Sequence, residues 1–175
     1  MIGYKIIRGV AGIYAKLFHR VKYIGRENEP KEGGCIVIAN HSSFTDPLFV
    51  ACALKRPVSF MAKSELTSNA ILRWGFKVCN VVTINRGESD IAALRKTCDI
   101  VNSGNVTGIF PQGTRIHCEA PQTDTAQPGT GLIAVRSKAT ILPVSVCYGK
   151  KNLCPKFMRK VIVYVGKPMT YEEYA

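Results

Sequence analysis

The sequence predicts an α/β layered domain, in which helices flank a central, mostly parallel sheet of about six or more strands. Short runs rich in Val and Ile, bounded by Gly, Pro or Asn, alternate along the chain with segments of helical periodicity. The chain has 175 residues, a length that suits one domain built around a single core. We expect a separate amphipathic helix over residues 1–20 and the domain itself over residues 21–175.

Residues 1–20 predict a basic amphipathic helix. At 100° per residue, one side holds Ile2, Ile6, Ile7, Val10, Ile13, Tyr14, Leu17 and Phe18. The opposite arc holds Lys5, Arg8, Gly9, Gly12, Lys16 and His19. The helix could pack on the core of the domain, or it could lie in the plane of a membrane with its cations facing anionic headgroups. Because each glycine weakens a helix by about 1 kcal/mol, we expect it to need a surface of protein or lipid.

The remaining elements follow in order along the chain. Strands are predicted over residues 35–39, 58–62, 81–84, 106–110, 141–147 and 161–165. Helices are predicted over residues 47–54, 66–78, 90–102 and 131–137. The helix over 90–102 has the clearest signals, with Ser89 as N-cap, Gly104 as its stop, and one apolar face formed by Ile91, Leu94 and Val101.

Two segments do not fit this alternation. Residues 116–130 form a long polar loop, which we expect to be mobile or to face the substrate. Thr170 and Glu173 have the spacing of a capping box, yet the sequence ends at Ala175. So short a helix cannot hold itself together, so these residues either pair with another part of the protein or belong to a longer chain.

The composition limits the partners and the compartment. A net charge of +12 attracts nucleic acid, anionic lipid, phosphorylated substrates or acidic carrier proteins. The seven cysteines include no C-x-x-C pair, which favours reduced, buried thiols in a cytosolic compartment. We expect no metal site, because the histidines lack ligand spacing among themselves and with the cysteines.

The strongest candidate for chemistry is the segment NHSSFTD, residues 40–46, which directly follows a predicted strand. His41 can take a proton from a hydroxyl, and Asp46 can orient the imidazole and stabilise its charged form. Asp46 before Pro47 could instead serve only as a helix N-cap. Ser42 or Ser43 could be a nucleophile, although neither lies in a G-x-S-x-G turn.

Further polar groups follow other predicted strands. Phe110 begins the segment FPQGTR, which contains Gln112, Gly113, Thr114 and Arg115; Arg86 lies in NRG, and Lys63 follows VSFMA. If those strands are parallel neighbours, the three cations Lys63, Arg86 and Arg115 converge near His41 at one edge of the sheet. An arginine there can bind a phosphate through two hydrogen bonds.

These blocks resemble the lysophosphatidic acid acyltransferase family, whose members share an N-H-x-x-x-x-D box. AKSEL, INRG, FPQGTR and ATILPVSV match further family blocks in order, and the resemblance covers about residues 20–168. It implies transfer of a fatty acyl group from acyl-CoA or acyl-carrier protein to 1-acylglycerol-3-phosphate (lysophosphatidic acid), giving phosphatidic acid, without a cofactor. It also implies an anionic membrane surface as a partner and a peripheral position on the cytoplasmic face.

By the same resemblance, His41 is the general base and Asp46 its partner, while Lys63, Arg86 and Arg115 hold the phosphate of the acceptor. Gln112, Gly113 and Thr114 belong to the acceptor-binding block. Gln112 replaces the usual glutamate of the family, which removes a negative charge and any ionic pairing with an arginine.

Two alternatives remain open. Another acceptor, glycerol-3-phosphate or a lysophospholipid, would use the same chemistry. A non-enzymatic basic module that binds lipid or nucleic acid is also compatible with the charge. We expect no nucleic-acid partner, because the sequence contains no zinc-finger, helix-turn-helix or stacked-aromatic pattern.

Overall fold

The computed structural model describes residues 2–84, 91–116, 126–149 and 160–175. The strands are β1 (Lys22–Ile24), β2 (Cys35–Ala39), β3 (Val58–Lys63), β4 (Val82–Ile84), β5 (Val106–Ile109), β6 (Thr140–Tyr148) and β7 (Val161–Val165). The α-helices are α1 (Ile2–His19), α2 (Asp46–Ala53), α3 (Ala70–Val78), α4 (Ile91–Asn102), α5 (Pro128–Ser137) and α6 (Tyr171–Tyr174). Two 3-10 helices, η1 (Arg26–Asn28) and η2 (Ser64–Ser68), complete the described elements.

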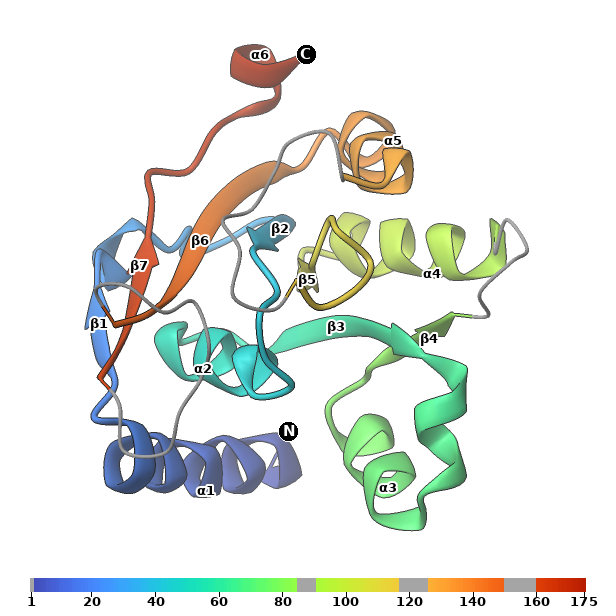
Figure 1. Cartoon of the computed structure of the whole chain (residues 1–175). Coiled ribbons are helices and arrows are strands. Elements are labelled where there is room, and N and C mark those ends of the chain that lie inside the picture. Colours follow the sequence, from blue (N-terminus) through green and yellow to red (C-terminus); the bar gives the residue numbers. More distant parts are fainter. Residues whose placement is uncertain (1, 85–90, 117–125, 150–159) are drawn as a thin grey trace.

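The described strands form one seven-stranded sheet in the order β1-β7-β6-β2-β5-β3-β4, which confirms the predicted α/β class (Figure 1). Neighbouring strands of this sheet run parallel, except that β6 and β7 are antiparallel. The strands β2, β5, β3 and β4 are therefore consecutive parallel neighbours, and their carboxyl ends lie along the same edge.

Helices cover both faces of the sheet (Figure 1). One face packs against α1 and α2 through a core that includes Phe49, Leu54, Leu142 and Tyr148. The other face packs against α4 and α5 through a smaller core that includes Ile36 and Ile133. The central strand β2 thus buries side chains on both sides, with Val37 in the first core and Ile36 in the second, as expected for a covered parallel sheet.

Several predicted boundaries were wrong. The helix predicted over 66–78 is divided into η2 and α3, because Asn69 caps α3 by accepting hydrogen bonds from the backbone of Ile71 and Leu72. Helix α5 begins at Pro128 rather than at residue 131, so the end of the predicted loop is helical. Strand β1 was not predicted, since its three residues carry no apolar run.

Helix α4 agrees with the prediction only in part. Gly104 adopts a left-handed φ of 77° just after the helix, as expected of a stop residue. Val101 is buried, but Ile91 is 63% exposed and therefore does not belong to the apolar face that packs on the sheet. The N-cap predicted at Ser89 lies outside the described residues.

Helix α1 packs on the domain, but not through its aliphatic face. Its buried side chains are Tyr4, Ala11, Ala15 and His19. The hydroxyl oxygen of Tyr4 accepts a hydrogen bond from the backbone N–H of Val58 at 3.0 Å. The aliphatic side chains Ile2, Ile6, Val10, Ile13 and Leu17 remain exposed. Among the described helices, none is both long enough and apolar enough to cross a membrane.

The short C-terminal helix α6 is held by tertiary contacts. The capping box between Thr170 and Glu173 forms as predicted. The hydroxyl of Tyr174 lies 3.1 Å from the carbonyl oxygen of Ala134 and 2.7 Å from that of Ala139. These contacts to the end of α5 provide the support that four residues alone cannot supply.

Candidate active site

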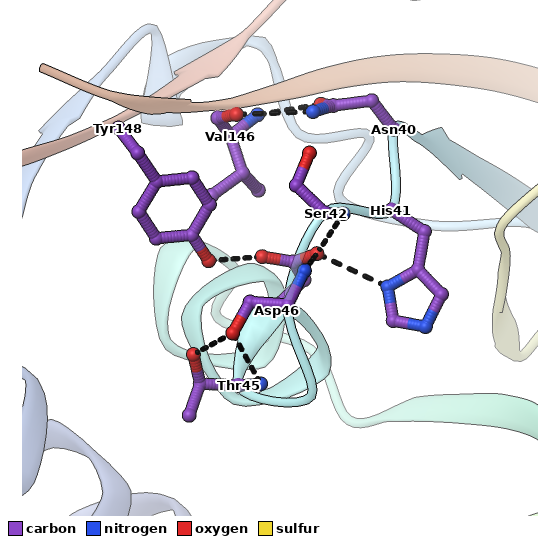
Figure 2. Close-up of polar contacts among 8 residues, drawn as sticks. Asn40, His41, Ser42, Thr45, Asp46, Val146 and Tyr148 are labelled. Atoms are coloured by element: carbon purple, nitrogen blue, oxygen red, sulfur yellow. Dashed lines mark hydrogen bonds and ion pairs between the residues drawn. The ribbon is translucent and has the colours of Figure 1, made fainter. Parts of the chain in front are cut away.

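His41 and Asp46 face each other immediately after β2. The Nδ1 atom of His41 lies 3.0 Å from Oδ2 of Asp46, and the two side chains are 18% and 0% exposed (Figure 2). Because a carboxylate only accepts hydrogen bonds, Nδ1–H donates to it, and the lone pair of a neutral imidazole then lies on Nε2. Among the described residues no hydrogen-bond partner faces Nε2, which leaves this atom available to a substrate hydroxyl.

The loop between β2 and α2 holds Asp46 in place. Its Oδ2 also accepts hydrogen bonds from the backbone N–H groups of Ser42 and Ser43, at 2.6 Å and 2.7 Å. The N-cap of α2 is Thr45, one residue earlier. The alternative in which Asp46 only caps the helix is therefore wrong, because its oxygens contact the loop and His41 instead.

Tyr148, at the end of β6, completes the set of donors around the carboxylate. Its hydroxyl donates to Oδ1 of Asp46 (Figure 2), and its side chain is 1% exposed. Burial, followed by the neighbouring negative charge of Asp46, raises the pKa of this hydroxyl well above its ordinary value. Tyr148 therefore remains a neutral donor at any ordinary pH.

Sequence reasoning missed this role of Tyr148. The only signal was a tyrosine at the end of a strand, where a buried hydroxyl needs a partner. The partner lies 102 positions earlier in the chain, and only the pairing of β6 with β2 brings the two residues together.

Asn40 anchors the start of the loop between β2 and α2. Its side-chain amide donates to the carbonyl oxygen of Val146 at 3.0 Å and accepts from the N–H group of the same residue at 2.8 Å (Figure 2). This reciprocal pair continues the β2–β6 ladder by one residue while the backbone turns away. The position of His41 is thereby fixed to the rigid sheet.

The FPQGTR segment follows β5 and lies beside His41. The Phe110 ring stacks on the His41 imidazole, with 4.3 Å between centroids and 24° between planes. The backbone N–H of Ile116 donates to the His41 carbonyl at 2.8 Å. Because β2 and β5 pair in parallel, the structure brings these two sequence blocks together as predicted.

Within that segment, Gln112 is buried, whereas Gly113, Thr114 and Arg115 are exposed. Gly113 has a left-handed φ of 62°, which glycine adopts without a steric penalty. The Oε1 atom of Gln112 is buried and has no hydrogen-bond partner among the described residues. An unsatisfied acceptor at this position is suited to a donor group on a ligand.

The structure describes two of the three predicted cations, Lys63 and Arg115. Lys63 is the last residue of β3, two strands from His41, a separation of about 10 Å across the sheet. Arg115 lies on the loop that contacts His41, and its side chain is exposed. Arg86 lies outside the described residues. Lys63 and Arg115 thus share the edge that carries His41, although neither contacts it.

Metal-ligand geometry is not present in the described part of the chain, where no three His, Cys, Asp or Glu side chains cluster. The described cysteines are free thiols, and burial raises the pKa of Cys35 to about 12. That thiol is therefore protonated and unreactive at neutral pH.

The site thus combines a buried carboxylate, an oriented imidazole and an open carboxyl edge of a parallel sheet, an arrangement that can activate a hydroxyl for attack. The sequence profile of the acyltransferase family matches residues 20–147, and the chain belongs to that family.

Individual relatives share this likeness over most of the chain. A 1-acyl-sn-glycerol-3-phosphate acyltransferase of Bacillus subtilis (strain 168) is 25% identical over 98% of this chain and 85% of its own length. One of Borreliella burgdorferi is 29% identical over 93% of this chain, which spans 61% of that relative. The crystal structure of the 1-acyl-sn-glycerophosphate acyltransferase PlsC of Thermotoga maritima superposes with a TM-score of 0.77 and 28% identity, covering 98% of this chain and 70% of that one.

Proposed function

We propose that this chain transfers a fatty acyl group from acyl-CoA or acyl-carrier protein to the free hydroxyl of 1-acylglycerol-3-phosphate, giving phosphatidic acid. The observation that carries the proposal is the His41–Asp46 pair, whose imidazole Nε2 lies at the carboxyl edge of the sheet without a hydrogen-bond partner in the described ranges. The names of the relatives in Bacillus subtilis and Borreliella burgdorferi support the same acceptor.

In the proposed reaction, Nε2 of His41 removes the proton from the acceptor hydroxyl as its oxygen attacks the thioester carbonyl. A new carbon–oxygen bond forms, the carbon–sulfur bond breaks, and the departing thiolate takes the proton from the imidazolium. Asp46 stabilises the positive charge that His41 carries between these steps. No covalent acyl-enzyme and no cofactor are needed, because the acceptor attacks the donor directly.

The phosphate of the acceptor would be held by Lys63, Arg86 and Arg115. The first and third are described, and both lie at the edge that carries His41. The separation of about 10 Å between the ends of β2 and β3 leaves room for a glycerol phosphate between base and cation. Gln112, Gly113 and Thr114 would line the same acceptor site, where the Oε1 of Gln112, which has no partner among the described residues, can accept a hydrogen bond.

The decisive test is thioester release with both donors and a panel of acceptors: 1-acylglycerol-3-phosphate, glycerol-3-phosphate and a lysophospholipid. We expect release with the first acceptor, loss of release in His41→Ala, and an unchanged thermal melt of that variant. Substantial turnover by His41→Ala would exclude the imidazole as the base. Release only with another acceptor would retain the chemistry and change the substrate.

We also propose that the protein binds an anionic membrane surface peripherally, on the cytoplasmic side. Helix α1 exposes an aliphatic stripe, in which Ile2 is 77% and Val10 63% exposed, while its opposite face packs on the domain. Helix α3 adds Ile71 and Trp74, which are 78% and 60% exposed. Apolar surface of this extent is typical of an interaction site, and tryptophan is favoured at the lipid–water interface.

The two helices are adjacent at one end of the molecule, at the bottom of Figure 1. They touch where Gly3 of α1 meets Val78 of α3, since a Cβ at Gly3 would lie 2.8 Å from a Val78 methyl group. The cytoplasmic side is favoured by the free thiols of the described cysteines, which suit a reducing compartment.

Vesicle flotation tests the membrane proposal without removing α1, whose inner face is buried. We expect Ile6→Glu with Ile13→Glu to reduce the bound fraction about tenfold or more, because two carboxylates would enter the apolar interface. The matched control is Ile91→Glu with Leu132→Glu, where both side chains are similarly exposed on α4 and α5. Equal loss in both pairs would mean that added negative charge, rather than the stripe, weakens binding.

A further inference from the structure

An open hollow of about 540 Å³ lies beneath α1, and we call it the α1 cleft. Its walls are the inner flank of α1, strand β1 and the C-terminal end of α2, which lie together at the lower left of Figure 1. Five cations line it: Lys5, Arg8, Lys16, Arg26 and Lys55. A second hollow of about 310 Å³ adjoins it and shares Lys5, Arg8 and Lys55.

The two arginines have a structural role that accounts for part of this charge. Arg8 donates to the carbonyl oxygens of Leu54 and Lys55, at 3.2 Å and 2.6 Å. Arg26 donates to those of Ala53 and Cys52, at 2.8 Å and 3.2 Å. Cations at these positions satisfy the last carbonyl groups of α2 and offset the negative end of its dipole. The arginines are thereby fixed, with further N–H groups to offer.

The three lysines have no such role. In the described part of the chain, the side chains of Lys5, Lys16 and Lys55 form no hydrogen bond or ion pair, and no acidic residue lines the cleft. The nearby carboxylate of Glu29 accepts from the backbone N–H groups of Lys55 and Arg56, so it offsets one of the five cations at most. Charges of one sign around a hollow repel one another unless an anion balances them. The cleft is therefore electrostatically suited to an anion.

The glycines of α1 provide an independent observation. Gly9 and Gly12 both line the cleft, although glycine inside a helix costs about 1 kcal/mol relative to alanine. A Cβ at either position would meet no atom within 4 Å, so packing does not require glycine there. A side chain at either position would enter the cleft. Glycine leaves that space free, so a ligand can approach the helix backbone closely.

The location of the cleft indicates the source of the anion. It lies at the C-terminal end of α2, whereas the carboxylate that holds His41 lies at the N-terminal end, about 12 Å away along eight residues. The cleft also flanks the helix whose other face is the exposed aliphatic stripe. When that stripe lies in a bilayer, the polar flank of α1 is at the depth of the headgroups.

We propose that the α1 cleft binds the phosphate-bearing headgroup of an anionic membrane phospholipid, separately from the acceptor at His41. Lys5, Lys16 and Lys55 contact the phosphate oxygens, and the backbone at Gly9 and Gly12 forms the wall beside it. The inference rests on the proposed membrane association of α1. The volume of the α1 cleft falls within the range of about 300–1,000 Å³ that is usual for small-ligand sites.

The test uses a water-soluble, monomeric lipid, dihexanoyl phosphatidylglycerol, with dihexanoyl phosphatidylcholine as the zwitterionic control and the full chain as the protein. Binding is measured by titration calorimetry and localised by the amide NMR resonances of Gly9 and Gly12. We expect the anionic lipid to bind about tenfold more tightly than the control and to shift both glycine resonances. Because neither a vesicle nor acyl transfer is involved, a negative result leaves the proposed reaction and membrane binding intact.

Two variants locate the site. Gly12→Leu fills the cleft without changing charge, and we expect it to abolish the preference for the anionic lipid while the melting temperature is unchanged or higher. Lys16→Gln should weaken binding about fivefold, whereas Lys96→Gln, which removes the same charge from α4, should have no effect. Equal affinity for the two lipids, or unchanged binding by Gly12→Leu, would overturn the proposal. The proposal would also be overturned if coenzyme A bound the cleft more tightly than the lipid and displaced it, since the cleft would then bind the phosphates of the acyl donor.

Discussion

Replacing Tyr148 by phenylalanine removes one hydroxyl from the centre of the site. The ring keeps its packing near Phe49, with 6.3 Å between centroids, but Oδ1 of Asp46 loses the donor that the structure provides. A hydrogen bond to a buried charged group contributes about 1.5–3 kcal/mol. For a domain of this size, a loss of about 2 kcal/mol corresponds to a fall in melting temperature of about 4–8 °C.

The same change should slow acyl transfer without weakening substrate binding. Asp46 retains His41 and two backbone N–H groups as partners, so the carboxylate stays in place but is held less firmly. We expect kcat to fall about tenfold, equivalent to about 1.4 kcal/mol, with unchanged KM for donor and acceptor, because Tyr148 is buried behind Asp46. Thioester release and a thermal melt measure the two effects.

The matched control is Tyr164→Phe, which removes a hydroxyl from a side chain that is 42% exposed on β7. It should change neither kcat nor the melting temperature. If Tyr148→Phe kept full kcat and stability, the hydroxyl would have no share in holding the carboxylate. A rise in KM alone would show instead that Tyr148 contacts a substrate.

Three further substitutions test other parts of the site. Asp46→Asn removes the charge: its amide oxygen can take the place of Oδ2, but its NH2 group then faces the Tyr148 hydroxyl and cannot accept from it. We expect kcat to fall about 10²–10⁴-fold and the melting temperature to fall at least as far as in Tyr148→Phe, because the same charge-assisted hydrogen bond is lost. A kcat within threefold of the parent would show that the charge does not act on His41. Lys63→Gln should raise KM for a phosphate-bearing acceptor about tenfold or more and leave KM for the donor unchanged. The control is Lys22→Gln, which replaces an exposed lysine on β1. An equal rise in KM for both substrates would contradict phosphate binding by Lys63. Gln112→Glu places a carboxylate at a position that is 9% exposed. We expect this change to reduce the free energy of unfolding, measured by urea titration, by about 1–3 kcal/mol. Higher stability would instead reveal a cation beside residue 112.

Much of the fold could be predicted, because a buried parallel sheet leaves a strong local signal. Strands with both faces covered must be apolar throughout, and the runs at β2, β5 and β7 were therefore recognisable. Strand β1 carries no such run, since its residues alternate between exposed and half-buried at the edge of the sheet. Its pairing with β7 depends on residues about 140 positions away, which no local pattern records.

Helix α1 shows a different limit of pattern reasoning. Its amphipathic period was correct, but the period does not say which face meets the protein. The small residues Ala11 and Ala15 allow the helix to approach α2 closely, and His19 packs edge-on against Phe49 at 5.3 Å between centroids. The aliphatic face, which the core alternative would have buried, remains outside.

In the candidate site, too, some contacts could be predicted from local sequence and others could not. The pairing of His41 with Asp46 could be predicted from the sequence, because five residues can span a single short loop; the structure adds that backbone N–H groups of this loop converge on the carboxylate. It also placed FPQGTR beside His41, since both segments follow strands of one parallel sheet. Two arrangements became visible only in the folded chain: β6 holds this loop through Tyr148 and through the bonds of Val146 to Asn40, and cations from α1 and its neighbours line a cleft at the far end of α2. These arrangements depend on strand order and helix packing, which join residues that are distant in the chain and therefore leave no spacing to read.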